Sequence, residues 1–337
     1  MSSLSYKKAG VDIKKQDVFV KEIRKMVSLK EGNLSKFIAF GDVVDFSKVK
    51  NRSDYLVFSC DGVGTKVQLA QKFNRHWVIG VDCVAMNVND IICRGAVPLY
   101  FSDYIACHKI DLPVLKEIIR GIVKGCKEAG CRLIGGETAQ MPSLYKEGEY
   151  DLAGFCIGVV SKKNLILSEN IKEGDLVLGL SSNGLHSNGF SLVRKVFNSE
   201  ELKKHRNVLL KPTRIYSKII LSLIDSINKQ VCVQKVIKGM AHITGGAFIN
   251  KAPKILPQGL SFLFYKGSWS VPSIFKIIQE KGNISTREMY TTFNMGIGFI
   301  IVIEPSFKEK IISFLKRRKI DVFCIGEVVK GNKVIIR

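Results

Sequence analysis

The sequence predicts an α/β (α+β) protein of two domains, and two observations lead to this prediction. Short apolar runs typical of β-strands alternate along the chain with longer segments in which apolar residues recur at helical spacing. Between Lys162 and Asp175 the chain is polar and lacks clear periodicity, which makes this stretch the best candidate for a domain junction. We therefore expect one domain over residues 1–168 and a second over residues 169–337, each with helices layered on a sheet.

The composition is that of a globular protein, because 46% of the 337 residues are hydrophobic, enough to build a core in each domain. No apolar run approaches the length needed to cross a bilayer, and the N-terminus lacks the apolar segment of a signal peptide. The cysteines form no Cys-x-x-Cys pair and lie mostly in apolar segments, which favours buried, reduced thiols. We therefore expect a soluble, cytoplasmic protein with no membrane association.

The net charge of +22 would permit binding to nucleic acid. However, the lysines are spread along the whole chain, and Lys316–Lys319 is the longest basic block. The sequence has neither zinc-finger spacing nor the alternation of aromatic and basic residues found in RNA-recognition motifs. We therefore predict no nucleic-acid partner.

In the N-terminal half, the apolar run at residues 54–60 predicts a strand that delivers Asp61 at its C-terminal end. The segment Val78–Arg94 has apolar residues at helical spacing. Three polar residues fall together on another face of this helix, because seven or eight residues make about two turns: Asp82, Asn89 and Asp90. An amphipathic helix opens at Asp111 and closes at Gly130. Three further strands are expected over residues 98–107, 131–138 and 151–161, and the second of them leads into a glycine turn that presents Glu137.

In the C-terminal half, residues 176–182 predict a strand, and the loop "NGLHSNG" leads into a helix at Phe190. The polar residues 199–211 are expected to form a surface excursion, and Pro212–Thr213 to start the next helix. Residues 241–256 predict a strand end, a Gly-Gly turn and the start of a helix. The rest of the chain alternates helices with strands.

The stretch Cys60–Lys66, "CDGVGTK", contains the components of a phosphate-binding loop in an unusual order. A P-loop ends in Gly-Lys-Ser/Thr, whereas here the threonine precedes the lysine and an aspartate leads. Taken alone, the stretch is compatible with a degenerate P-loop, an ordinary turn or a different way of holding a nucleotide.

Three acidic residues stand at the ends of predicted elements: Asp61, Asp90 and Glu137. Oxygen ligands on rigid elements suit Mg²⁺, which binds through carboxylates together with substrate phosphates. Each residue alone is better explained as a helix cap or turn carboxylate, but three in one half of the chain favour a metal site.

Two glycine turns, Gly135–Gly136 and Gly245–Gly246, would expose backbone N–H groups to anions, although plain turn geometry explains them equally well. His186 and His242 lie beside predicted loops and have a structural interpretation as buried or capping residues. The chain contains no catalytic serine triad, zinc-protease motif or dinucleotide fingerprint. The residues thus indicate a metal-dependent, nucleotide-using enzyme without a P-loop.

Eight motifs in order resemble the phosphoribosylformylglycinamidine cyclo-ligase (AIR synthetase) family, over nearly the whole chain. They are "SYKKAGVDI" at 5–13, "DGVGTK" at 61–66, "DIICRGAVP" at 90–98, "GGETAQMP" at 135–142, "GLHSNGFSLVRK" at 184–195, "PTRIY" at 212–216, "HITGGAF" at 242–248 and "MYTTFNMGIG" at 289–298. The resemblance implies that "CDGVGTK" is part of an ATP site and not a damaged P-loop.

The resemblance also implies a homodimer whose N-terminal domains join into a β-barrel, each followed by a C-terminal α/β domain. The implied reaction is the ATP- and Mg²⁺-dependent ring closure of formylglycinamidine ribonucleotide, through an iminophosphate, to aminoimidazole ribonucleotide in purine biosynthesis. Implied metal ligands are Asp61, Asp90 and Glu137, and implied catalytic residues are His186, Lys66 and Asp90. Implied nucleotide contacts are Gly41, Asp61, Gly62, Gly64, Thr65, Lys66, Asp90 and Gly95. Implied substrate contacts are Ser187, Asn188, Thr213, Arg214, His242, Thr244, Gly245 and Gly246.

One segment departs from the family pattern: Ile38–Asp45 retains only Gly41 of the usual glycine-rich run. Two alternatives therefore stay open, another small-molecule kinase of the same superfamily and a non-catalytic nucleotide-binding homologue. Two roles are open for His186, which is expected to act on the substrate but would alternatively cap the helix that starts near Phe190.

Overall fold

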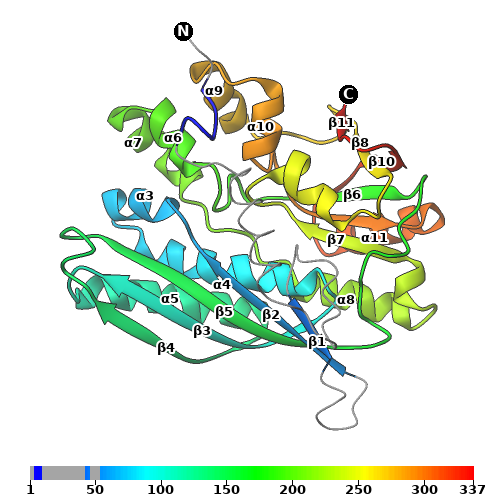
Figure 1. Cartoon of the computed structure of the whole chain (residues 1–337), viewed down its shortest axis with the longest axis horizontal. Coiled ribbons are helices and arrows are strands. Elements are labelled where there is room, and N and C mark those ends of the chain that lie inside the picture. Colours follow the sequence, from blue (N-terminus) through cyan, green and yellow to red (C-terminus); the bar gives the residue numbers. More distant parts are fainter. Residues whose placement is uncertain (1–3, 10–41, 46–53) are drawn as a thin grey trace.

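The computed structural model describes residues 4–9, 42–45 and 54–337, and two sheets divide the chain between them (Figure 1). The strands between residues 42 and 161 form a five-stranded sheet of order β1-β2-β5-β3-β4. The strands between residues 176 and 336 form a six-stranded sheet of order β11-β8-β10-β6-β9-β7. This arrangement confirms the fold class that the sequence predicts, a mixed α/β fold in two halves.

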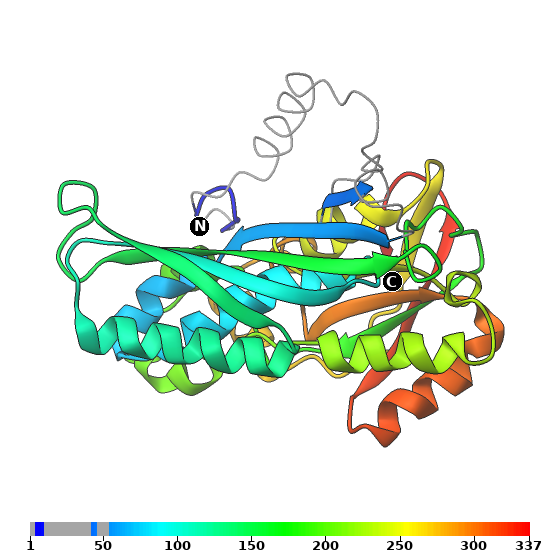
Figure 2. The same ribbon diagram turned by 90° about the horizontal axis from the view of Figure 1, so that it is seen from below.

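Two helices cover one face of the N-terminal sheet. Its strands are β1 (Asp42–Asp45), β2 (Asp54–Gly62), β3 (Val97–Cys107), β4 (Arg132–Gln140) and β5 (Tyr150–Ser161). Helices α4 (His76–Ile92) and α5 (Leu112–Ala129) lie against one face, and among the described residues no helix covers the other (Figure 2). The short helix α3 (Lys66–Phe73) precedes α4.

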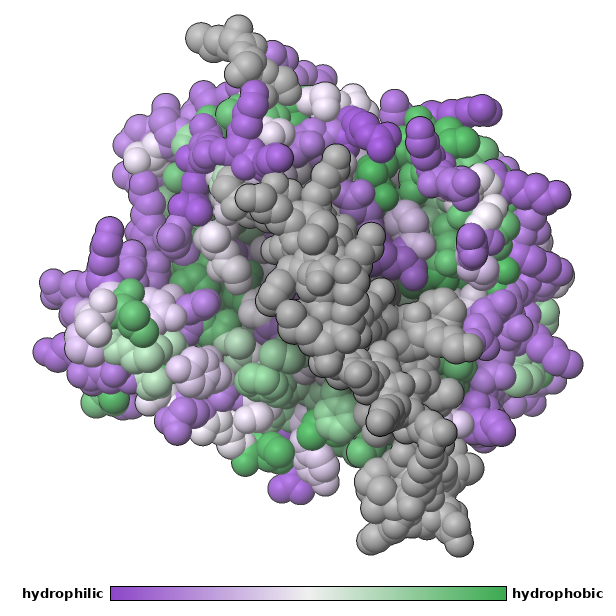
Figure 3. Space-filling model, viewed as in Figure 1, coloured by the Kyte–Doolittle hydropathy of each residue, from purple (hydrophilic) through white to green (hydrophobic). Residues whose placement is uncertain are grey.

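Burial alternates along β5 accordingly, because successive side chains point to opposite faces of the sheet. The open face carries large apolar side chains that remain exposed: Val97, Tyr100, Tyr104 and Phe155. Figure 3 shows apolar residues gathered over this sheet, next to a mostly hydrophilic rim.

Close packing of α4 on α5 depends on two glycines. A Cβ on Gly121 would lie 1.9 Å from the carbonyl oxygen of Trp77, and one on Gly80 would lie 2.1 Å from that of Ile118. Only glycine permits the two backbones to approach so closely. This contact fixes the axis of α4, which carries Asp82, Asn89 and Asp90.

The C-terminal sheet is built on β9 (Ile297–Ile303), in which every residue is buried. It pairs with β6 (Leu176–Ser181) on one side and β7 (Ile237–His242) on the other. Strands β8 (Leu260–Phe264), β10 (Val322–Lys330) and β11 (Ile335–Ile336) complete the sheet. The helices are α6 (Phe190–Val196), α7 (Ser199–Leu209), α8 (Ser217–Asn228), α9 (Ser273–Lys281), α10 (Thr286–Thr292) and α11 (Lys308–Arg317).

The structure changes two expectations for this half. Residues 199–211, expected as a polar surface excursion, include helix α7 over residues 199–209; Asn198 and Glu201 make a capping box at its start. The next helix begins at Ser217 and not at Pro212–Thr213, because the backbone N–H groups of this segment bond to side chains of α4.

Some residues for which the sequence makes a prediction lie outside the described ranges, among them Gly41 and residues 10–13 of the first motif. The described part of that motif lies on the C-terminal domain, where the backbone N–H of Tyr6 donates to Glu288. No helix in the described ranges combines the length and apolar character needed to cross a bilayer.

Candidate active site

The polar face of α4 joins the two domains. Asp82 Oδ1 accepts the backbone N–H of Thr213 at 2.6 Å. About two turns farther along, Asn89 Nδ2 donates to the carbonyl oxygen of Arg214 at 2.8 Å, and its Oδ1 accepts the N–H of Tyr216 at 3.0 Å. The predicted grouping on one helix face is therefore confirmed for Asp82 and Asn89, and it positions the segment that precedes α8.

Asp90, the third residue of this group, meets two basic side chains of the C-terminal domain. Its Oδ1 lies 3.0 Å from His242 Nδ1, and its Oδ2 lies 3.5 Å from Lys251 Nζ. Burial raises the pKa of Asp90, but Lys251 and His242 outweigh burial, so this pKa lies below its usual value. Asp90 is thus a carboxylate held ionised at a domain boundary.

The tautomer of His242 follows from its neighbours. Burial lowers its pKa despite the nearby Asp90, so the ring is neutral at pH 7. Because Nδ1 faces a carboxylate, it carries the proton, and Nε2 is left to accept from Asn89 Nδ2 at 3.4 Å. His242 therefore orients Asp90 and is expected to act through it.

Asp61 stands at the end of β2, close enough to Asp90 and Lys251 for both to influence its ionisation. Burial is the main cause that raises the pKa of Asp61 to about 6; Asp90 raises it further, whereas Lys251 lowers it. Its Oδ1 accepts the N–H of Gly62 at 2.8 Å. The carbonyl oxygen of Asp61 accepts from Asn87 of α4 at 3.1 Å, which ties the strand end to the helix.

The loop after Asp61 is open at its glycine and anchored at its threonine. Gly64 has φ of 75°, and no atom of the described residues beyond its chain neighbours lies within 4 Å of the position that a Cβ would take. Thr65 Oγ1 lies 2.9 Å from Ser191 Oγ of α6, which is a further bond between the domains. We call Gly62–Thr65, which the sequence predicts to contact a nucleotide, the nucleotide loop.

The structure corrects the role expected for Lys66. Its side chain is fully buried, with Nζ 2.8 Å from Asp82 Oδ2 and 2.7 Å from the carbonyl oxygen of Lys211. An ammonium held by these two partners does not face the open side of the nucleotide loop. Lys251, which nothing in its local sequence distinguishes from the other lysines, is the cation that lies beside the carboxylates.

Glu137 does not join the other two acids within one chain. Asp61, Gly154, Asp103 and Gly136 form one row across the sheet, so three strand spacings of about 4.8 Å place Glu137 roughly 14 Å from Asp61. Glu137 also pairs with Tyr104, whose side chain is on the open face. The expected three-carboxylate site is therefore not formed in a single chain.

Gly95 has a packing explanation. Its φ is 74°, and a Cβ there would lie 2.3 Å from the carbonyl oxygen of Asn164 in the segment between the two sheets. The glycine lets the end of α4 approach this segment, and the structure does not bring it to the nucleotide loop.

The residues expected to hold the substrate are brought together in the C-terminal domain. Ser187 Oγ and Thr213 Oγ1 lie 2.8 Å apart and are both buried. Asn188 Nδ2 would be 3.4 Å from a Cβ on Gly245, so the two loops touch at a glycine. Arg214 donates to the carbonyl and hydroxyl oxygens of Ser181 at 3.0 and 2.8 Å, which directs its guanidinium to the end of β6.

The Thr244–Gly246 turn leads into a single π-helical turn, Ala247–Lys251, and not into a regular helix. Thr244 is buried, and Gly246 has φ of 87°. This short element is what carries Lys251 back to Asp90. The helix start expected at the second glycine turn is therefore present only as this short π-helical turn, with Gly246 at its N-cap and Lys251 as its last residue.

His186 occupies a strained position in the loop before α6, with φ of 62°. Its Nε2 accepts from the N–H of Asn183 at 3.1 Å and lies 3.5 Å from that of Arg214, so the proton is on Nδ1. Burial lowers its pKa well below the usual value, so the ring is neutral. The helix it was alternatively expected to cap begins at Phe190, with Gly189 as its N-cap and no side-chain cap, so that alternative is wrong.

The donor set fits a magnesium ion that is bound largely by phosphates. Within the described ranges no three His, Cys, Asp or Glu side chains are arranged to hold a metal ion. Mg²⁺ commonly uses one or two carboxylates and takes its other ligands from water and nucleotide phosphates, a requirement that Asp61 and Asp90 meet.

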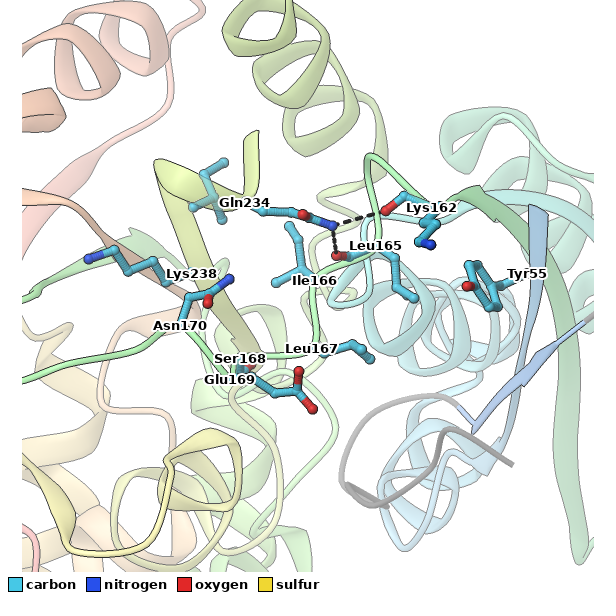
Figure 4. Close-up of a pocket in the computed structure, with 11 residues that line it drawn as sticks. Tyr55, Lys162, Leu165, Ile166, Leu167, Ser168, Glu169, Asn170, Gln234 and Lys238 are labelled. Atoms are coloured by element: carbon cyan, nitrogen blue, oxygen red, sulfur yellow. Dashed lines mark hydrogen bonds between the residues drawn. The ribbon is translucent and has the colours of Figure 1, made fainter. Parts of the chain in front are cut away.

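A separate cavity of about 180 Å³ lies at the other end of β2, where Gln234 donates to the carbonyl oxygens of Lys162 and Leu165 (Figure 4). Tyr55, on its wall, is six residues from Asp61, or about 20 Å along the strand. The cavity therefore belongs to the junction between the sheets and is distinct from the carboxylate site.

Two family models cover most of the chain. AIR synthase related protein, N-terminal domain, matches residues 42–160, and the C-terminal domain of the same description matches residues 172–337. The chain belongs to the AIR synthase related protein family. The boundary predicted at residue 168 falls between these matches and stays a prediction.

Other AIR synthase related proteins are similar over their full length. A phosphoribosylformylglycinamidine cyclo-ligase of Alkaliphilus metalliredigens is 44% identical over 100% of this chain and 98% of its own. That of Caldanaerobacter subterraneus subsp. tengcongensis is 46% identical over 99% and 100%. That of Chromobacterium violaceum is 44% identical over 97% and 95%.

Solved structures with this family's fold are more distant in sequence. A crystal structure of a HypE–HypF complex superposes with a TM-score of 0.67 at 19% identity, over 95% of both chains. AaThiL complexed with AMPPCP and TMP superposes with a TM-score of 0.66 at 16% identity, over 97% of this chain and 95% of the other. At such identities the likeness establishes the fold alone.

Proposed function

We propose that this protein is a phosphoribosylformylglycinamidine cyclo-ligase, which uses ATP to close the imidazole ring of aminoimidazole ribonucleotide. The observation that carries the proposal is the full-length identity of 44% and 46% to relatives of that name. The geometry agrees, because two carboxylates, a lysine and an open glycine loop meet where the two domains join.

The reaction removes an amide oxygen, which is a poor leaving group until it is phosphorylated. The amide oxygen of formylglycinamidine ribonucleotide attacks the γ-phosphorus of ATP, the bond to the bridging oxygen breaks, and ADP leaves. The amidine nitrogen then attacks the carbon of the iminophosphate. A C–N bond forms, the C–O bond breaks, and the former amide oxygen departs in inorganic phosphate as the nitrogen loses a proton.

Phosphoryl transfer depends mainly on positioning and on neutralisation of charge. We assign Asp61 and Asp90 as ligands of Mg²⁺, which supplies positive charge to the phosphates of ATP when bound. His242 holds the carboxylate of Asp90 in orientation through Nδ1–H. Lys251 lies beside Asp90 and supplies a second positive charge at the same place.

The substrate side of the site is formed by the loops that pack around Thr213. Ser187 and Thr213 present adjacent hydroxyls, and Asn188 contacts the Thr244–Gly246 turn. Polar groups of this kind suit a ligand that has a ribose phosphate and a polar acyclic chain, as formylglycinamidine ribonucleotide does. We propose that His186 shapes this loop by accepting backbone N–H groups at Nε2; its Nδ1 lies toward Gly298 of β9, and no partner for Nδ1 occurs in the described part of the chain.

We also propose a homodimer in which the open faces of the two N-terminal sheets pack together into a barrel. The support is the apolar character of that face, where Tyr100 and Phe155 are 42% and 45% exposed. Glu137 is on the same face, so a second copy would bring its carboxylate toward the partner's site.

The direct test is incubation of the protein with ATP, Mg²⁺ and formylglycinamidine ribonucleotide, with phosphate and aminoimidazole product measured together. The proposal predicts one phosphate released for each product molecule, and Asp90→Asn is expected to lose this activity while it keeps the fold. A kinase of the same superfamily would transfer phosphate to another acceptor and leave this substrate unchanged, and a non-catalytic homologue would release nothing.

A further inference from the structure

The ion pair between Lys66 and Asp82 has both side chains fully buried, and it lies on the boundary between the domains. Lys66 is the first residue of α3, directly after the nucleotide loop. Asp82 is on α4, eight residues or about 12 Å before Asp90. The pair therefore sits behind the nucleotide loop and not in it.

Each member of the pair also holds the backbone of the C-terminal domain. Lys66 Nζ donates to the carbonyl oxygen of Lys211 at 2.7 Å, and Asp82 Oδ1 accepts the N–H of Thr213 at 2.6 Å. The ammonium also lies 5.6 Å from the ring centroid of Phe190, the first residue of α6. Lys211–Thr213 is thus held at both ends by one ion pair.

A contribution to the stability of the fold does not explain why a buried ion pair occurs here. Removing two charges from water costs several kcal/mol for each ion, and replacing a buried ion pair with apolar residues of similar volume is often neutral or stabilising. The two bonds to backbone groups are what an apolar pair could not supply. They act on a segment that immediately precedes Arg214 and whose Thr213 hydroxyl meets Ser187 at 2.8 Å.

We propose that Lys66 and Asp82 are positioning residues that fix the distance between the nucleotide loop and the substrate segment Lys211–Arg214. The inference rests on the proposed function, since it assigns ATP to one side of the pair and the ribonucleotide to the other. Neither residue contacts the reacting atoms. Their effect is exerted through the backbone of Lys211 and Thr213, and a displacement of about 1 Å at a reacting centre costs on the order of 100-fold in rate.

A matched pair of double variants separates positioning from stability. Lys66→Met/Asp82→Asn and Lys66→Met/Asp82→Leu are both uncharged and similar in volume, but only the first keeps an acceptor for the Thr213 N–H. We expect both to fold, with KM for ATP within about threefold of wild type. The kcat of the leucine variant should be at least tenfold below that of the asparagine variant. Equal kcat values in two folded variants would overturn the proposal.

The single variant Asp82→Asn gives a second test, which does not require either double variant to fold. It keeps the acceptor and removes only the charge, so kcat should stay within about tenfold of wild type even where the melting temperature falls. A folded Asp82→Asn variant that loses more than a hundredfold in kcat would contradict positioning through the backbone. The wild type is assayed first: a wild type that makes no aminoimidazole product rejects the proposed function itself, independently of the comparison among variants.

Discussion

Asp61 is the residue whose ionisation the surrounding structure disfavours most clearly among the site carboxylates. Burial raises its pKa to about 6, above the value in an unfolded chain, so the protonated form is favoured by folding. The stabilising contribution of this group is therefore present at low pH and is lost as the pH rises through about 6. At pH 7.5 an ionised Asp61 reduces the stability of the fold, which is the expected cost of keeping a metal ligand in place.

We expect Asp61→Asn to raise the melting temperature at pH 7.5 in the presence of a chelator, while it removes activity. The gain should be about 1–2 kcal/mol after discounting the pKa shift for partial exposure, and the Asn carbonyl can still accept the N–H of Gly62. The difference from wild type should shrink as the pH is lowered to 5. Asp151→Asn, an exposed acid on the neighbouring strand, serves as the control and should leave the melting temperature unchanged. A destabilised Asp61→Asn protein, or a gain independent of pH, would show that burial does not dominate at this site.

At the scale of elements, α4 organises the molecule, because one face packs on α5 and another bonds to the C-terminal domain. At its interface with α5, the backbones of the two helices are in contact at Gly80 and Gly121.

We expect Gly121→Ala to destabilise the protein by several kcal/mol, since the added methyl would meet the carbonyl of Trp77 at 1.9 Å. Val123→Ala, on the exposed side of the same helix, should change the melting temperature only slightly. If thermal denaturation gives the two variants similar melting temperatures, the helices are not in the contact described.

The elements show what the sequence could predict. Periodicity located α4 and α5 because their apolar residues repeat over several turns, and Asp111 and Gly130 bracket α5 as N-cap and C-cap. Helix α7 was missed because its composition is polar, although Asn198 and Glu201 carried a visible capping signal. The start of α8 was misplaced because side chains of α4, distant in sequence, bond to the backbone that precedes it.

The sequence could predict those site residues whose position depends on a single helix or strand. Asp61 and Asp90 stand at element ends, and that position is readable from local pattern. Lys66 could not be placed in advance, because only the packed structure shows Asp82 and the Lys211 carbonyl around its ammonium. Lys251 gave no signal, since its approach to Asp90 depends on an irregular π-helical turn.

At the scale of the whole molecule, the open apolar face of the N-terminal sheet and the position of Glu137 on it favour a dimer with shared sites (Figure 2). A mixed dimer tests this arrangement. We expect Glu137→Gln and Asp90→Asn homodimers each to be nearly inactive, whereas co-folded mixtures should recover activity, because one site per heterodimer then contains both intact carboxylates. Mixtures no more active than the separate variants would contradict a role for Glu137 across the dimer, and sedimentation of an active monomer would reject the dimer.

The central claim of this account is that ATP activates the amide oxygen of the substrate, and oxygen labelling tests it most directly. Formylglycinamidine ribonucleotide labelled with ¹⁸O in the amide carbonyl is converted by the wild-type enzyme with ATP and Mg²⁺, and the released phosphate is examined by mass spectrometry. Because the amide oxygen attacks the γ-phosphorus before it leaves the carbon, one ¹⁸O atom should appear in each phosphate formed with aminoimidazole product. Product accompanied by unlabelled phosphate would contradict phosphoryl transfer to the substrate.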